Sequence, residues 1–165
     1  MHRVRLRVFM ARRTDQLTDA QEWVEEGGQI IPSLLERGAR ALLTPVNGYL
    51  ITISRVISFV ALEIGGLEHY PVTSTALGLL FTAAVFAWLG TAPLFVRGTW
   101  LLPPVVALVP SDVEVFVVPQ YSFWFAGLAL FSLVLWRADD RSRVAARVAV
   151  ALVCGLSNPI AFRSL

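Results

Sequence analysis

The chain has 165 residues, of which 56% are hydrophobic and 16% are charged; its mean hydropathy is +0.64 and its net charge is +2. Soluble domains carry about 25% charged residues, whereas this chain contains long windows without any charge. We therefore predict an integral membrane protein of the all-α class. A nucleic-acid-binding domain is excluded because no basic stripe with interleaved aromatic residues occurs. The single Cys154 excludes a disulfide framework and a cysteine-based metal site.

The N-terminal region, residues 1–28, is polar; it begins with several arginines and then becomes acidic. A tryptophan and three carboxylates are concentrated just before a pair of glycines, and the carboxylates belong to Glu22, Glu25 and Glu26. Two interpretations stay open for this acidic segment. It is either a site that binds a metal or acts as a base, or a solvated turn beside a membrane domain.

The next region, residues 29–66, is predicted to be juxtamembrane. Residues 29–43 show helical periodicity but are too short and too charged to span, so we expect an amphipathic helix lying on the bilayer surface. Residues 49–66 are more apolar but contain Arg55 and Glu63. An arginine at the bilayer centre costs about 2.5–3.5 kcal/mol, so a crossing and a second interfacial helix both stay open.

The C-terminal region, residues 67–165, is expected to hold the transmembrane helices. No Asp, Glu, Lys or Arg lies between Glu68 and Arg97, which predicts a clear span over residues 73–95. Three further apolar segments follow: a half-length or kinked one at 100–109, a clear span within 115–136 that starts after Pro119, and a last one at 144–162. We expect an integral membrane bundle of about four transmembrane helices plus one or two interfacial amphipathic helices.

The distribution of arginine predicts the orientation. Four arginines gather in and beside one short loop, which the positive-inside rule assigns to the cytoplasm: Arg137, Arg141, Arg143 and Arg147. Asp112 and Glu114 then lie outside, and Arg97 is cytoplasmic as well if residues 100–109 cross. If residues 49–66 cross, the acidic segment is cytoplasmic, which the charge bias favours. If they lie on the surface, the segment faces outward, and an upstream crossing is needed.

Several short motifs resemble, in order and spacing, a group of bacterial polytopic membrane proteins related to GT-C-type glycosyltransferases. The motifs are WVEEG at residues 23–27, PVNGYL at 45–50, Arg55, VPSDVEVF at 109–116, YSFW at 121–124 and GLSNP at 155–159. The resemblance covers most of residues 12–162. Members of the group are much longer and have a membrane crossing before the acidic motif. The resemblance therefore implies that this chain is the N-terminal portion, or a fragment, of such a protein.

The resemblance also implies candidate site residues. The GT-C relatives transfer sugars from polyprenyl-phosphate-linked donors and use an acidic residue of the first outer loop as base or metal ligand. By this resemblance Glu25 and Glu26 are candidate catalytic residues, and a divalent cation is a candidate cofactor. The candidate substrate-binding residues are Arg55, Asp112, Glu114, Tyr49 and Trp124. The alternatives for these five are a snorkelling arginine, polar residues of an interhelical loop and an interfacial aromatic belt.

Three functions are compatible with these patterns. The first is the N-terminal portion of a GT-C-like membrane glycosyltransferase that uses a polyprenyl-phosphate-linked sugar in cell-envelope glycoconjugate assembly. The second is a non-catalytic membrane subunit or scaffold that packs against a larger polytopic partner. The third, a small transporter, has least support because no charged residue lies in the middle of the clearest spans. Each predicts a multi-pass protein of the inner or plasma membrane, with the lipid bilayer and other membrane proteins as partners.

Overall fold

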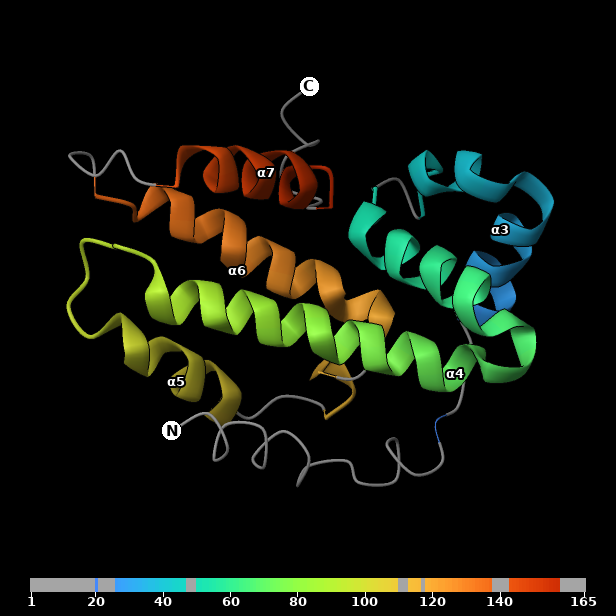
Figure 1. Ribbon diagram of the computed structural model, residues 1–165, viewed down its shortest axis with the longest axis horizontal. Helices are drawn as coiled ribbons and strands as arrows, with labels where there is room; N and C mark the ends of the chain where they lie inside the picture. Colours follow the sequence, from blue (N-terminus) through green and yellow to red (C-terminus); the bar gives the residue numbers. More distant parts are fainter. Residues whose placement is uncertain are drawn as a thin grey trace.

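The computed structural model describes residues 20, 26–46, 50–109, 113–116, 118–137 and 143–157. Within these residues every named element is a helix and there is no strand, so the predicted all-α class is confirmed for the described part of the chain. The longest helix, α4 (Thr52–Thr91), contains a sharp kink at Gly66. That helix organises the others (Figure 1). The division into juxtamembrane and transmembrane regions stays a prediction.

The kink in α4 is caused by Gly66, whose φ is 58° and ψ is −169°. This combination is essentially restricted to glycine, since a Cβ atom would be strained there. It divides α4 into a first arm, residues 52–65, and a second arm, residues 67–91. The chain reverses at the kink, so that the two arms lie side by side (Figure 1). Ala61 of the first arm and Tyr70 of the second are buried in one cluster.

The first arm is covered by the preceding segment of the chain. A π-helix, η1 (Glu26–Ile30), runs directly into α3 (Ile31–Arg37), and a 3-10 helix, η2 (Gly38–Leu43), follows. Helical structure is therefore present where periodicity predicts it, over residues 29–43. Most of the predicted apolar face is buried, namely Ile30, Ile31, Leu34 and Ala41, whereas Leu35 is exposed. The buried face packs against Ile51, Phe59, Ala61 and Leu62, at the start of the first arm and along it.

The second arm is surrounded by the short C-terminal helices. In Figure 1, α6 lies between the second arm and α7, while α5 lies on the other side of α4. The bounds are η3 (Thr99–Leu101), α5 (Leu102–Leu108), η4 (Val113–Phe116), η5 (Pro119–Tyr121), α6 (Ser122–Val134) and α7 (Val144–Gly155). Their common core contains Val85, Phe86, Phe125 and Ala129, and also Ile53 and Ile57 from the first arm. The two arms thus belong to one packed unit.

Among the described residues, one helix is long and apolar enough to cross a membrane, and it is α4. Its second arm alone is about 37 Å long at about 1.5 Å per residue, which exceeds the hydrocarbon core of about 30 Å. By contrast α6 has 13 residues and α7 has 12, which correspond to about 20 Å and 18 Å. The expected four crossings are therefore not confirmed. The half-length apolar helix predicted at 100–109 is present, as η3 and α5.

The two connections that carry arginine lie at the same end of the helices. The backbone N–H of Phe95 donates to the carbonyl of Leu135 at 2.9 Å, and the N–H of Arg137 donates to that of Pro93 at 3.1 Å. The Arg137 Nε also donates to the Leu94 carbonyl at 3.1 Å. The loop that contains Arg97 is thereby joined to the loop that begins at Arg137, as the predicted orientation requires.

Candidate functional site

Arg55 lies in the first turn of α4, and its side chain is turned into the protein. It is 2% exposed, and its NH1 nitrogen donates a hydrogen bond to the Ser33 Oγ at 2.8 Å. The Ser33 hydroxyl in turn donates to the carbonyl of Ile30 at 2.8 Å. The Nε nitrogen of Arg55 is buried and has no hydrogen-bond partner in the described part of the chain. The guanidinium therefore joins α3 to the first arm.

Glu26 is the first residue of η1, and it is 1% exposed. Burial of a carboxylate is costly unless other groups compensate its charge, so Glu26 is not part of a solvated turn. The helix that begins at Glu26, η1, leads directly into α3, which carries Ser33. Glu25, the other candidate catalytic residue, lies outside the described residues.

Of the remaining candidate residues, Trp124 alone has its side chain described. Trp124, at the start of α6, is 59% exposed, and its ring lies 5.0 Å from that of its neighbour Phe123. The backbone of Glu114 forms part of η4. Tyr49 and Asp112 lie outside the described residues. Binding of a sugar phosphate by this set stays a prediction.

No cluster of three or more His, Cys, Asp or Glu side chains suited to a metal ion occurs in the part of the chain that the structure describes. Glu26 is described, but its predicted partner Glu25 is not. A divalent cation at the acidic segment therefore also stays a prediction.

A set of hydroxyl groups, which sequence reasoning missed, holds the start of α4 to distant parts of the chain. The preceding residue Ile51 supplies no side-chain cap, and the first N–H groups of a helix have no partner within it. Ser157, which follows α7, accepts a hydrogen bond from the N–H of Ile53 at 2.8 Å. The Thr52 hydroxyl donates to the Leu156 carbonyl at 3.1 Å, and the Ser54 hydroxyl donates to the Gln120 carbonyl at 2.9 Å. Nothing in the local sequence indicates these caps, because their partners lie 66 and 104 residues away.

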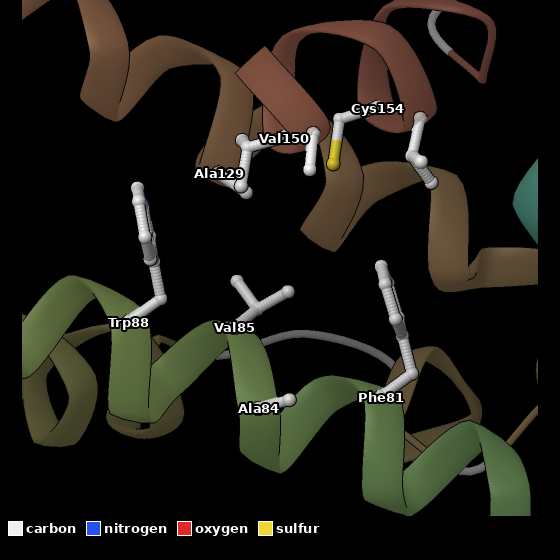
Figure 2. A pocket seen from close by; sticks show the side chains of 9 residues that line it. Phe81, Ala84, Val85, Trp88, Ala129, Val150 and Cys154 are labelled. Atoms are coloured by element: carbon white, nitrogen blue, oxygen red, sulfur yellow. The ribbon is translucent and has the colours of Figure 1, made fainter. Parts of the chain in front are cut away.

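A second feature that sequence reasoning missed is an apolar groove of about 300 Å³ between the second arm of α4, α6 and α7. Figure 2 shows the rings of Phe81 and Trp88 on either side of Val85, all pointing from α4 toward the other two helices. The Cys154 thiol points into the space from the α7 side (Figure 2). The lining residues are Phe81, Ala84, Val85, Trp88, Ala129, Ala149, Val150, Val153 and Cys154. On α4 and on α7 the lining residues recur three and four positions apart, so they lie on one face of each helix. This spacing is the sequence signal that could have identified the two faces.

One end of this groove adjoins the arginine-bearing end of the molecule. The Trp88 Nε1 donates to the Ser132 Oγ at 2.8 Å, and the Trp88 and Trp136 rings lie 5.4 Å apart. The guanidinium carbon of Arg147 lies 5.1 Å from the centre of the Trp136 ring, within the range of a cation–π interaction. Arg143 NH1 donates to the Thr91 Oγ1 at 3.3 Å, one turn beyond Trp88.

Comparison with known proteins assigns no relative to this chain. No protein-family model, no curated protein and no solved structure matches it. The resemblance to GT-C-type glycosyltransferases therefore stays a prediction, and the described geometry is the basis for the proposals that follow.

Proposed function

We propose that this chain is a membrane-embedded helical subunit whose second arm of α4 crosses the bilayer. The arm has sufficient length, and it contains no Asp, Glu, Lys or Arg after Glu68. Arginines follow it at one end, whereas Glu63 and Glu68 lie close to the kink at its other end. This asymmetry is typical of a helix with a cytoplasmic basic end.

The surface of the short helices is the observation that carries the proposal. Large apolar side chains are exposed on all three of them, including Leu108 on α5 (65%), Phe131 on α6 (59%) and Leu152 on α7 (63%). Water disfavours so much exposed apolar surface, so we assign it to lipid or to a protein partner within the bilayer.

The length of the short helices favours a protein partner over lipid alone. Helices of 7 to 13 residues end inside a hydrocarbon core of about 30 Å. Their terminal carbonyl groups need hydrogen-bond partners, and the core supplies no water. Non-helical backbone at this depth is tolerated where other protein covers it. We therefore favour a non-catalytic subunit that packs against a larger polytopic membrane protein.

The proposal is tested in two steps. Sodium carbonate extraction of membranes should leave the chain in the pellet, since a crossing helix resists alkaline release. A photo-crosslinking residue at Leu152 should then give discrete cross-links to another protein, whereas one at Glu36, exposed on α3, should give none. Release by carbonate contradicts membrane embedding. Cross-links from Leu152 to lipid alone contradict the subunit function but leave membrane embedding intact.

The second candidate function is the glycosyltransferase portion, and the burial of both Glu26 and Arg55 favours it. Buried ionisable groups are costly and cluster at functional sites. In this proposal Glu26 supplies the base for an acceptor hydroxyl, and the α3 region faces the outer side of the membrane. The donor is a polyprenyl-phosphate-linked sugar, and Glu25 is the second catalytic carboxylate.

The side of the membrane tests this second candidate. A single cysteine at Gly27, in a Cys154→Ala background, is treated with a membrane-impermeant thiol reagent in intact cells. Labelling in intact cells is the expected result for an outer acidic segment. Protection in intact cells with labelling after lysis would sink the glycosyltransferase function, while the subunit function would stand.

A further inference from the structure

The groove between α4, α6 and α7 has walls made almost entirely of hydrocarbon. Apart from the Cys154 thiol, its lining side chains are apolar or aromatic. It is open on the side of Val153, a lining residue of α7 that is 46% exposed. An apolar ligand would therefore enter from the lipid side, without passing a polar barrier.

The size of the groove restricts what can occupy it. A helix with its side chains is about 10 Å across, so a space of about 300 Å³ holds less than one helical turn. A peptide helix is thus excluded as the occupant of the lined space. A single extended hydrocarbon chain is narrow enough, and it needs no polar partners along its length.

Positive charge at one end of the groove indicates the headgroup. Residues 137–147 contain more basic than acidic side chains: Arg137, Arg141, Arg143 and Arg147 against Asp139 and Asp140. Arg143 is bonded one turn beyond Trp88, and Arg147 lies over Trp136, which contacts Trp88. Since Trp88 lines the groove, a chain lying in it would end beside these two guanidinium groups.

We propose that this groove binds one acyl chain of an anionic phospholipid, with the lipid phosphate held by Arg143 and Arg147. The indole rings of Trp88 and Trp136 lie between chain and phosphate, at the level where tryptophan is enriched in membranes. Arginine donates to phosphate oxygens with well-matched geometry. The inference rests on the proposed membrane embedding, but it does not depend on the identity of a protein partner.

The probe is phosphatidylglycerol with a photoactivatable group on one acyl chain, and the same chain on phosphatidylcholine is the headgroup control. The full chain is reconstituted in nanodiscs with each lipid, and labelled peptides are identified by mass spectrometry. We expect phosphatidylglycerol to label the α4 and α7 residues of the groove several times more strongly than phosphatidylcholine does. Equal labelling by the two lipids would overturn the proposal, since it indicates ordinary boundary lipid.

Two pairs of variants separate groove from headgroup. Ala149→Phe fills the groove from an exposed lining position, and Ala151→Phe makes the same change on the same helix outside the lining. Labelling should be lost in the first and kept in the second. Arg143→Gln and Arg147→Gln should each lower labelling by phosphatidylglycerol about fivefold, whereas Arg97→Gln, at the same end of the molecule, should not.

Each result decides a different question. Labelling that survives Ala149→Phe, or that is unaffected by both arginine variants, overturns the lipid site. Carbonate extraction of the same variants checks the proposed function separately: retention in the membrane without groove labelling contradicts the lipid site alone. Thermal unfolding of each variant distinguishes a loss of lipid binding from a loss of folding. If Arg147→Gln is unstable, Arg143→Gln tests the contact with the headgroup independently.

Discussion

The two arms of α4 are joined by a single residue, yet they pack in different ways. The first arm buries hydroxyl and guanidinium groups, namely Ser54, Arg55 and Ser58, and long-range hydrogen bonds hold it to α3, to η5 and to the end of α7. The second arm buries the hydroxyl-bearing Ser74, Thr75 and Thr82 together with aromatic and aliphatic side chains. In the described part of the chain, its side-chain bonds to other segments join Trp88 to Ser132 and Thr91 to Arg143. The two arms thus differ in that the one buried charged side chain of α4, Arg55, lies in the first arm.

The two arms of α4 also differ in what surrounds them, which decides where a polar side chain is tolerated. The first arm is enclosed by other parts of the chain, and several of its polar groups find partners there. The buried Arg55 Nε and Ser58 Oγ have no hydrogen-bond partner in the described part of the chain. The second arm exposes side chains such as Val72 and Leu80, which are 60% and 66% exposed, and a polar group at these positions would face hydrocarbon in the proposed membrane. We expect substitutions in the first arm to act through lost polar contacts and those in the second arm to act through packing.

The largest effect is expected for Arg55→Ala, in the first arm. The change removes a fully buried side chain and its bond to Ser33, so unfolding in detergent, followed by circular dichroism, should become easier by about 3 kcal/mol. Arg37→Ala, at an exposed position on α3, should change the free energy of unfolding by less than about 0.5 kcal/mol. Arg55→Met retains most of the volume, and a loss as large as that of Arg55→Ala would show that the charge, and not packing, dominates.

The next effect concerns the joint between the arms. Gly66→Ala has open space around the added Cβ but requires a strained backbone, and we expect a loss of about 2 kcal/mol. Gly155→Ala also meets open space, but its backbone has no positive φ, so it should be neutral or raise stability by about 0.5 kcal/mol. Equal effects of the two changes in the same unfolding experiment would mean that the kink is not set by Gly66.

A smaller loss is expected when the start of the first arm loses its distant cap. Ser157→Ala leaves the buried N–H of Ile53 without its acceptor, and we expect a loss of about 1.5 kcal/mol. Hydrogen exchange should become faster at Ile53 and neighbouring amides, and not in the second arm. Ser157→Thr keeps the acceptor and serves as the control. Unchanged exchange at Ile53 in Ser157→Ala would contradict the capping function.

The smallest effect is expected for the polar contact of the second arm. Trp88→Phe and Ser132→Ala each remove the same hydrogen bond, so each should cost about 1 kcal/mol, and the double variant should cost less than their sum. Trp124→Phe, at an exposed position, should be silent. Strict additivity in this cycle would show that the bond contributes nothing to stability and that the second arm depends on apolar packing alone.

Much of the helical layout can be predicted from the sequence. The window without Asp, Glu, Lys or Arg before Arg97 predicts the long second arm, and the periodicity of residues 29–43 predicts a helix with a buried face. The adjoining position of the Arg97 and Arg137 loops also follows from charge bias. The predicted four crossings are not confirmed. Apolar composition does not distinguish a long helix from a short one that ends in a turn.

For the candidate sites, too, the sequence indicates some features and the tertiary structure decides others. The sequence singles out Arg55 as a charge within an apolar segment, and it singles out Glu26 as part of an acidic segment that resembles a catalytic motif. The tertiary structure decides that both are buried, and Arg55 is held against Ser33 of α3. It also creates the groove, since the lining residues of α4, α6 and α7 are far apart in the sequence and meet only in the folded chain. Local patterns determine helices and their apolar faces, whereas which faces meet depends on long-range contacts that a sequence pattern does not specify.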